Sequence, residues 1–186
     1  MPQVTTIDQP STPTENRETV TSGQISDVPE NNNASGESPQ GSVTDAANFE
    51  ITENEDGTVT ISRYIGTETD IVIPSQIGGK TVSAIGNVTS ITAVVIPDGV
   101  TEIQDNAFYG CTSLETVTIP SSVTLLRNCA FCDCPNLRAV YFKGDAPQQA
   151  NYVFDSTENV TMYYQDGTSG WENPWHGRPA EVYIPE

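Results

Sequence analysis

Apolar residues in the second half of the chain recur at a fixed interval of 23 residues. The segments IPDGVTEIQDNAFYGCTSLETVT, from Ile96, and IPSSVTLLRNCAFCDCPNLRAVY, from Ile119, are identical at nine of their 23 positions. Most of these positions are apolar, and the matched pairs include Val100 with Val123, Ala107 with Ala130, Phe108 with Phe131, Cys111 with Cys134, Leu114 with Leu137 and Val117 with Val140. The shared register predicts an internal structural repeat.

Each 23-residue unit predicts one turn of a solenoid. Leu114, Val117 and Ile119 have the spacing of a strand whose apolar side chains face the interior, and the proline that follows ends the strand because it has no amide hydrogen to donate. Residues 100–103 predict a second short extended segment, and residues 106–111 a single helical or 3₁₀ turn. So short a unit covers its apolar residues only when another unit stacks on it, so we expect ladders of Phe, Cys and Leu in a mainly β fold.

The same pattern sets the expected domain boundaries. Residues 49–72 begin with FEITENEDGTVTISRY, whose apolar and polar positions alternate on both sides of the NEDG turn and predict an N-terminal β-hairpin. The repeat coils are expected at residues 73–95, 96–118, 119–141 and 142–164, and a C-terminal cap at residues 165–186.

The coil at 73–95 is expected to be irregular. Val82 and Ile85 match Val100 and Ile103 only if a five-residue insertion around IGGKT is offset by a five-residue deletion where NAFYGC should follow. Terminal units of solenoids are commonly atypical, because they close the core against water.

Residues 1–48 have a different composition. They contain no aromatic residue, are dominated by Thr, Ser, Pro, Asn, Gln and Glu, and carry seven acidic side chains against the single Arg17. A segment of this kind buries too little apolar area to offset its ordering entropy, so we interpret it as a disordered linker. A docking motif for a partner is the alternative.

The formal net charge of -18 narrows the range of partners. Nucleic acid and anionic membrane surfaces would repel the chain, so we expect neither as a partner. No apolar run approaches the roughly 18 residues of a membrane span, so no membrane insertion is expected, and the first residues lack the basic and apolar regions of a signal peptide. The charge is consistent with a monomer that stays in solution in an extracellular setting.

Three of the four cysteines fall in the stretch CAFCDC. Cys134 occupies the same repeat position as Cys111, so both are interpreted as small buried side chains. Cys129 and Cys132 replace residues on the flank of the turn and are a possible disulfide in an oxidising compartment. A metal or redox site at residues 129–134 is the alternative, although the one histidine, His176, lies far away in the sequence and is expected at the surface or in the cap.

The succession Ile-Pro, Val-Thr-x-Ile, Ala-Phe-x-x-Cys-x-x-Leu and Val-x-Ile-Pro resembles the BspA-like leucine-rich repeats of bacterial surface proteins. The resemblance covers residues 49–183. It implies a right-handed leucine-rich-repeat coil stack, here of about four units, in a secreted or cell-surface protein. Characterised members of that family are implicated in adhesion to extracellular matrix proteins and to other cells, so the resemblance implies an extracellular protein or glycan ligand.

No local motif in the chain signals catalysis or a cofactor. The sequence contains no Gly-x-Ser-x-Gly, phosphate-binding glycine loop or HExxH, so we expect a non-enzymatic protein without cofactors. A solenoid instead offers the outer face of its sheet for binding. The 23-residue register predicts two outward columns, Ala93, Thr116, Ala139 and Met162 in one, and Val95, Thr118, Tyr141 and Tyr164 in the other.

The residues from Thr116 onward in these two columns are our candidate ligand-binding residues. Stacked tyrosines provide large contact area at a modest entropy cost. The alternative is that Tyr141 and Tyr164 only cover the neighbouring coils. At the level of the whole chain, the alternative is a structural spacer or a truncated piece of a larger surface protein.

Overall fold

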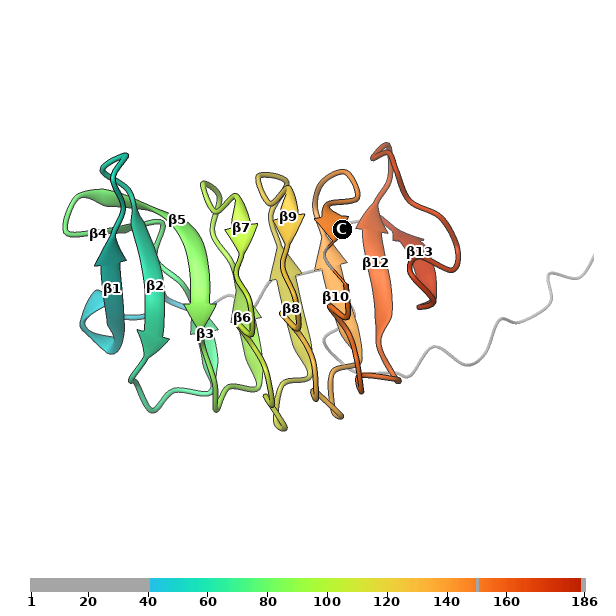
Figure 1. The fold of residues 1–186 in the computed structure, drawn as a ribbon, viewed down its shortest axis with the longest axis horizontal. Helices are drawn as coiled ribbons and strands as arrows, with labels where there is room; N and C mark the ends of the chain where they lie inside the picture. Colours follow the sequence, from blue (N-terminus) through green and yellow to red (C-terminus); the bar gives the residue numbers. More distant parts are fainter. Residues whose placement is uncertain (1–40, 150, 185–186) are drawn as a thin grey trace, which may run out of the picture. The chain divides into compact units, whose positions relative to one another are not determined.

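The computed structural model describes residues 41–149 and 151–184, which form a stack of short coils (Figure 1). Most of the expected linker, residues 1–40, lies outside the described residues. Regular structure in the described part is almost entirely β, with thirteen strands and one 3₁₀ helix, Ala46–Asn48 (η1).

The strands form two sheets. A seven-stranded sheet has the order β1-β2-β5-β7-β9-β11, with β4 paired to β5, and consists of Phe49–Glu53 (β1), Val59–Tyr64 (β2), Gln76–Ile77 (β4), Lys80–Asn87 (β5), Glu102–Ile103 (β7), Leu125–Leu126 (β9) and Gln148–Gln149 (β11). A six-stranded sheet has the order β13-β12-β10-β8-β6-β3 and consists of Asp70–Val72 (β3), Ala93–Val95 (β6), Thr116–Ile119 (β8), Ala139–Phe142 (β10), Thr161–Gln165 (β12) and Ala180–Tyr183 (β13). The chain passes from one sheet to the other in each coil.

The predicted 23-residue register is present in the central coils. Val94 pairs with Val117 and Val117 pairs with Val140, in parallel strands of the six-stranded sheet. The side chains of these three valines are fully or almost fully buried. Parallel pairing of like positions places each apolar residue over its equivalent in the preceding coil, so the core extends along the whole stack.

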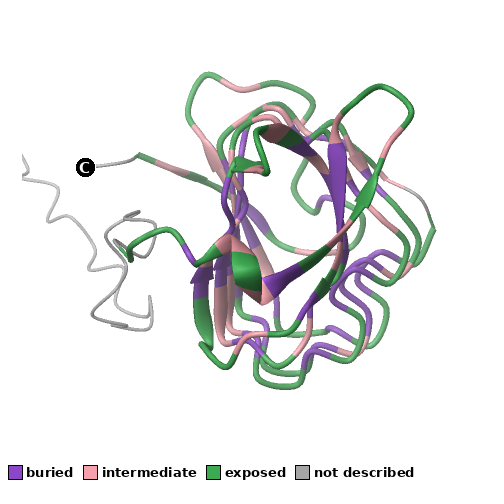
Figure 2. Cartoon of the chain, turned by 90° about the vertical axis from the view of Figure 1, so that its left-hand side faces the viewer, coloured by how far each residue is buried: buried purple, intermediate pink, exposed green. Residues whose placement is uncertain are grey.

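Three stacked phenylalanines run through this core. The ring centroids of Phe108 and Phe131 lie 5.0 Å apart, and those of Phe131 and Phe154 lie 5.3 Å apart, with interplanar angles of 3° and 6°. Phe108 and Phe131 are completely buried. Figure 2, seen from the β1 end of the stack, shows buried residues on the inner side of the coils. Burial of one such ring contributes about 1.5–3 kcal/mol, so this ladder is a principal source of stability.

The side chains at the repeated cysteine position form a second buried ladder, and they donate hydrogen bonds to backbone carbonyls. The Cys134 thiol donates to the Phe108 carbonyl at 3.1 Å, and the Cys111 thiol donates to the Val88 carbonyl at 3.1 Å. In the next coil Thr157 takes the same place, and its hydroxyl donates to the Phe131 carbonyl at 2.6 Å. Each side chain therefore satisfies a buried carbonyl of the coil before it, which explains why this position needs a small donor.

The N-terminal hairpin and the irregular first coil agree with the sequence prediction. β1 and β2 are antiparallel, and Gly57 in their turn has a φ of 83°. The IGGKT insertion is the β4–β5 hairpin, and beyond it Ile85 pairs with Ile103, which is 18 residues later rather than 23. The boundary at residue 48 is too late, because Thr44 is buried and its hydroxyl accepts a hydrogen bond from the Val72 amide at 3.1 Å.

The last coil departs from the predicted register by one residue. Ala139 pairs with Thr161, and Tyr141 pairs with Tyr163, both 22 residues later. Val160 keeps the position of Leu137, but one residue is missing between it and the strand, so Met162 takes the inward position of Val140. This shift reverses which side chains of β12 face out.

The C-terminal segment packs as a cap on the last coil. The indole of Trp171 lies against the Tyr164 ring, with centroids 4.9 Å apart, and contacts the Phe142 ring at 4.8 Å. Trp175 is buried and also contacts Phe142, at 5.6 Å. β13 then adds a final parallel strand beside β12. The two tryptophans therefore cover the end of the core.

Candidate binding surface

The outward side chains of the six-stranded sheet form the candidate site. Within β8, Val117 and Ile119 are buried in the core. Side chains alternate between the two faces of a strand, so Thr116 and Thr118 lie on the outer face. The same alternation holds in β10, where Ala139 and Tyr141 lie beside these two threonines.

Three tyrosines from three neighbouring strands gather on this face. The rings of Tyr141 and Tyr163 stack with centroids 5.2 Å apart and an interplanar angle of 19°. Tyr183 of β13 meets the Tyr141 ring edge-on, at 5.6 Å and 83°. All three side chains are half-buried. We name Tyr141, Tyr163 and Tyr183 the tyrosine cluster.

The cluster keeps its hydroxyl groups neutral. Burial raises the pKa of all three phenols above the ordinary tyrosine value, and the Glu181 carboxylate adds to this effect at Tyr163. Each hydroxyl therefore retains its proton at neutral pH and is able both to donate and to accept a hydrogen bond. The cluster thus combines aromatic area with neutral polar groups.

The structure corrects two of the six candidate residues. Met162 is completely buried and faces the core, and Tyr164 packs against Trp171 under the cap. Their predicted outward places belong to Thr161 and Tyr163, because the last coil is one residue shorter. Thr116, Thr118, Ala139 and Tyr141 occupy the predicted face, although Thr118 and Ala139 are only 8% and 7% exposed.

Sequence reasoning missed Tyr163 and Tyr183. The signal for Tyr163 was present in the strand TMYYQ, where an inward Met162 continues the apolar row set by Val117 and Val140. Side chains alternate between the two faces of a strand, so an inward Met162 places the next residue, Tyr163, outward. Extending the 23-residue interval does not give this result. Tyr183 lies beyond the last repeat, and no repeat register reached it.

The cysteines of CAFCDC do not converge on one point. Cys129 and Cys132 are joined in a disulfide, with Cα atoms 4.7 Å apart. Cys134 is free, buried and turned toward the Phe108 carbonyl in the core. Contact with Cys134 and burial raise the pKa of the Cys111 thiol well above its ordinary value. Within residues 41–149 and 151–184, no group of three or more His, Cys, Asp or Glu side chains is placed to hold a metal ion.

The two-sheet coil stack with an exposed sheet face defines a leucine-rich repeat solenoid. The chain belongs to the BspA-type leucine-rich repeat family, because the sequence model of the family described as "BspA type Leucine rich repeat region" matches residues 69–168 with six copies. This confirms the family and the fold that the repeat pattern predicted. In the described part of the chain, no helix has the length and apolar character needed to cross a membrane.

Solved structures of similar proteins share the fold. A leucine-rich cell surface protein from Faecalibacterium prausnitzii A2-165 is 31% identical, with a TM-score of 0.55 over 76% of this chain and 42% of its own. A leucine-rich repeat protein from Bacteroides capillosus ATCC 29799 is 24% identical, with a TM-score of 0.55 over 66% of this chain and 99% of its own. The chain thus spans less than half of the Faecalibacterium protein. No curated protein matches the sequence.

Proposed function

We propose that this protein is a non-enzymatic binding module of the cell surface or the extracellular space, whose ligand contacts the outer face of the six-stranded sheet at the tyrosine cluster. The ligand is an extracellular protein or a glycan. The stacking of Tyr141 on Tyr163, with Tyr183 edge-on beside them, is the observation that carries this proposal.

The geometry of the cluster supports a contact surface. The three rings hold one another in place, so a ligand meets side chains whose conformational entropy is already reduced. Tyrosine is enriched at binding hot spots because it combines a large apolar area with a polar tip. Neighbouring Thr116 and Thr161 are half-buried and add hydroxyl groups beside the rings. Protein backbone and sugar hydroxyls both suit such a surface.

The proposed extracellular location rests on similarity to a solved structure and on net charge, and not on the geometry of the tyrosine cluster. The similar Faecalibacterium structure is described as a cell surface protein. A net charge of -18 opposes association with nucleic acid and anionic membranes. The first observation supports an extracellular location, and the high net charge favours a monomer because like-charged copies repel each other.

The proposal is tested by identifying a ligand and then removing the cluster. The full chain is applied to an array of extracellular matrix proteins and glycans, and each hit is measured again with Tyr141→Ser. We expect at least one saturable ligand whose affinity falls about tenfold or more in the variant, as for a hot-spot tyrosine. Tyr109→Ser is the matched control, because Tyr109 is 49% exposed on the turn and not on the sheet.

Two results would contradict the proposal. If no ligand saturates, the protein is a spacer rather than a binding module. If a ligand binds Tyr141→Ser as tightly as the unmodified protein, its contact lies elsewhere. Thermal unfolding of each variant, run in parallel, separates lost contact from lost fold.

A further inference from the structure

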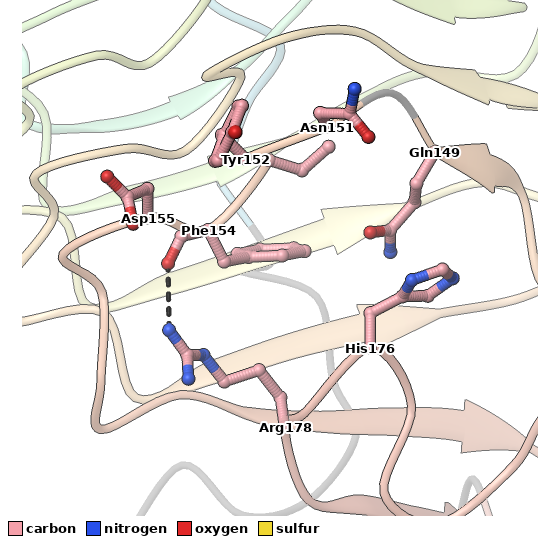
Figure 3. A pocket seen from close by; sticks show the side chains of 8 residues that line it. Gln149, Asn151, Tyr152, Phe154, Asp155, His176 and Arg178 are labelled. Atoms are coloured by element: carbon pink, nitrogen blue, oxygen red, sulfur yellow. Dashed lines mark hydrogen bonds between the residues drawn. The ribbon is translucent and has the colours of Figure 1, made fainter.

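A hollow of about 440 Å³ lies beside the last coil, away from the tyrosine cluster. It is bounded by the end of β11, by the turn at residues 151–156 and by the cap, and its lining includes Gln149, Tyr152, Phe154, His176 and Arg178 (Figure 3). This volume falls in the range of pockets that hold small molecules, about 300–1,000 Å³. The six-stranded sheet contributes none of these residues.

Two residues that line this hollow each have a buried side-chain donor with no hydrogen-bond partner among the described residues. Among the described residues, the Nε2 of Gln149 and the Nε of Arg178 are the buried side-chain nitrogen or oxygen atoms without a hydrogen bond. Both residues line the same hollow. Proteins seldom leave such groups unpaired, because a buried donor without a partner has lost its hydrogen bonds to water and gained none in return. An acceptor from outside the described part of the chain is therefore the complement that these two donors require.

The cap holds Arg178 rigidly at this position. Trp175 is anchored in the core, and its amide and carbonyl exchange hydrogen bonds of 2.9 and 3.0 Å with those of Arg178. The two residues between them, His176 and Gly177, have φ angles of 48° and 79°, as a tight two-residue turn requires. The guanidinium also donates from Nη2 to the Phe154 carbonyl at 2.9 Å. These contacts fix the direction of the guanidinium before any ligand arrives.

The charge of the hollow favours a carboxylate. Within residues 41–149 and 151–184, the ion pairs join Arg63 to Glu50, Lys80 to Glu53 and Arg127 to Glu102, so none of them neutralises Arg178. Asp155 lines the hollow as its one carboxylate, and its side chain is exposed. A single guanidinium matches a monoanion, and the charge of -18 opposes a dianion such as phosphate more strongly.

The second donor and the apolar wall define the rest of the ligand. In Figure 3 the Phe154 ring lies between the Gln149 amide and the Arg178 guanidinium, and the His176 ring lies near that amide. One face of the Phe154 ring stacks on Phe131. A ligand that pairs with both donors needs a carboxylate and a separate acceptor oxygen, with a C–H face against the ring.

We propose that this hollow binds a small carboxylic acid that carries a second acceptor oxygen, through Arg178 and Gln149. A sugar acid and an N-acylated amino acid share this chemistry. The site is independent of the proposed function, since it uses other residues on another face.

The test titrates the full-length protein with glucuronate, N-acetylglycine and glucose while the Arg178 Nε–H and Gln149 side-chain amide signals are followed by NMR. We expect saturable shifts at millimolar concentrations with at least one of the two acids and none with glucose, which lacks the carboxylate. The acid that binds more tightly shows whether the ligand is a sugar acid or an N-acylated amino acid. Arg178→Lys should weaken binding about tenfold or more, because an ammonium cannot offer the paired donors of a guanidinium.

The matched control is Arg63→Lys, an exposed arginine paired with Glu50, which should leave the affinity unchanged. Tyr141→Ser should also leave it unchanged, which separates this site from the tyrosine cluster. If neither acid moves the two signals, or if glucose moves them equally, the proposal is wrong. This readout uses the unmodified protein, so it stands even where a variant fails to fold.

Discussion

The Tyr163 ring stacks on the Tyr141 ring with centroids 5.2 Å apart, although the two residues are separated by 22 positions and not by the 23 of the repeat. A deletion of one residue in the last coil thus brings together two side chains that a uniform register would separate. The deletion turns Tyr163 outward and Met162 inward, and Tyr183 of the following strand completes the cluster. The proposed binding surface depends on this irregularity.

The central ring of the phenylalanine ladder should dominate the stability of the stack. Phe131 is fully buried between Phe108 and Phe154, so Phe131→Ala removes contacts with both and leaves a cavity. We expect the free energy of unfolding in urea to fall by about 3–5 kcal/mol. Phe154→Ala, at the end of the ladder, should have a smaller effect. Equal or negligible losses in the two variants would contradict the stacked core.

The hydroxyl of Thr157 should matter more than its volume. It accepts from the Cys134 amide at 3.1 Å and donates to the Phe131 carbonyl at 2.6 Å, both in the core. Thr157→Val keeps the shape of the side chain but leaves the Cys134 amide and the Phe131 carbonyl without this partner. We therefore expect the free energy of unfolding to fall by about 1–3 kcal/mol. Thr161→Val, on the outer face, is the control and should change stability little. An unaffected Thr157→Val would show that these groups find other partners.

Much of the fold was predictable, because burial repeats with the sequence. Phe108, Phe131 and Phe154 stack as predicted, and Ile85 meets Ile103 at the shifted register that the first coil requires. Sequence identity to the earlier coils is lower in the last coil, which is one residue shorter. The 23-residue interval, extended into this coil, therefore placed Met162 and Tyr164 on the wrong face of the strand. The cap was harder still, because Trp171 and Trp175 pack by shape rather than by period.

The four cysteines should fall into two chemical classes. Cys129 and Cys132 are disulfide-bonded, whereas Cys111 and Cys134 are free and buried. Without reductant, a thiol reagent should label none of them in the folded protein and two in denaturant, rising to all four after reduction. Mass spectrometry of the labelled chain counts the thiols. Four labelled thiols in denaturant without reductant would contradict the disulfide.

Loss of that disulfide should destabilise the fold only modestly. It closes a loop with a sequence separation of 3, and the chain-entropy model gives about 2 kcal/mol for so short a loop. Cys129→Ala should therefore lower the unfolding free energy by about that amount or less. A larger loss, measured by urea unfolding, would mean that the pair organises the turn beyond its entropic effect.

The tyrosine cluster should make stability fall at alkaline pH. Burial raises the pKa of Tyr141, Tyr163 and Tyr183 in the folded state, so the folded protein holds their protons to higher pH than the unfolded chain does. Their contribution is complete below the unfolded pKa of about 10 and is lost as pH rises through the folded pKa. Urea unfolding across this range should show the decline, and a Tyr141→Phe, Tyr163→Phe variant should show less of it. An equal decline in both proteins would place the titrating groups elsewhere.

The adjacent residues Tyr163 and Tyr164 provide the most direct test of the binding surface. Tyr163 faces outward on Tyr141, whereas Tyr164 packs on Trp171 under the cap. For Tyr163→Ser and Tyr164→Ser we measure two quantities. These are the affinity for the ligand found on the array and the free energy of unfolding in urea. We predict that Tyr163→Ser loses about tenfold or more in affinity with little change in stability, and that Tyr164→Ser loses about 2 kcal/mol or more in stability. The reverse result, with binding lost at Tyr164 and stability lost at Tyr163, would contradict the account.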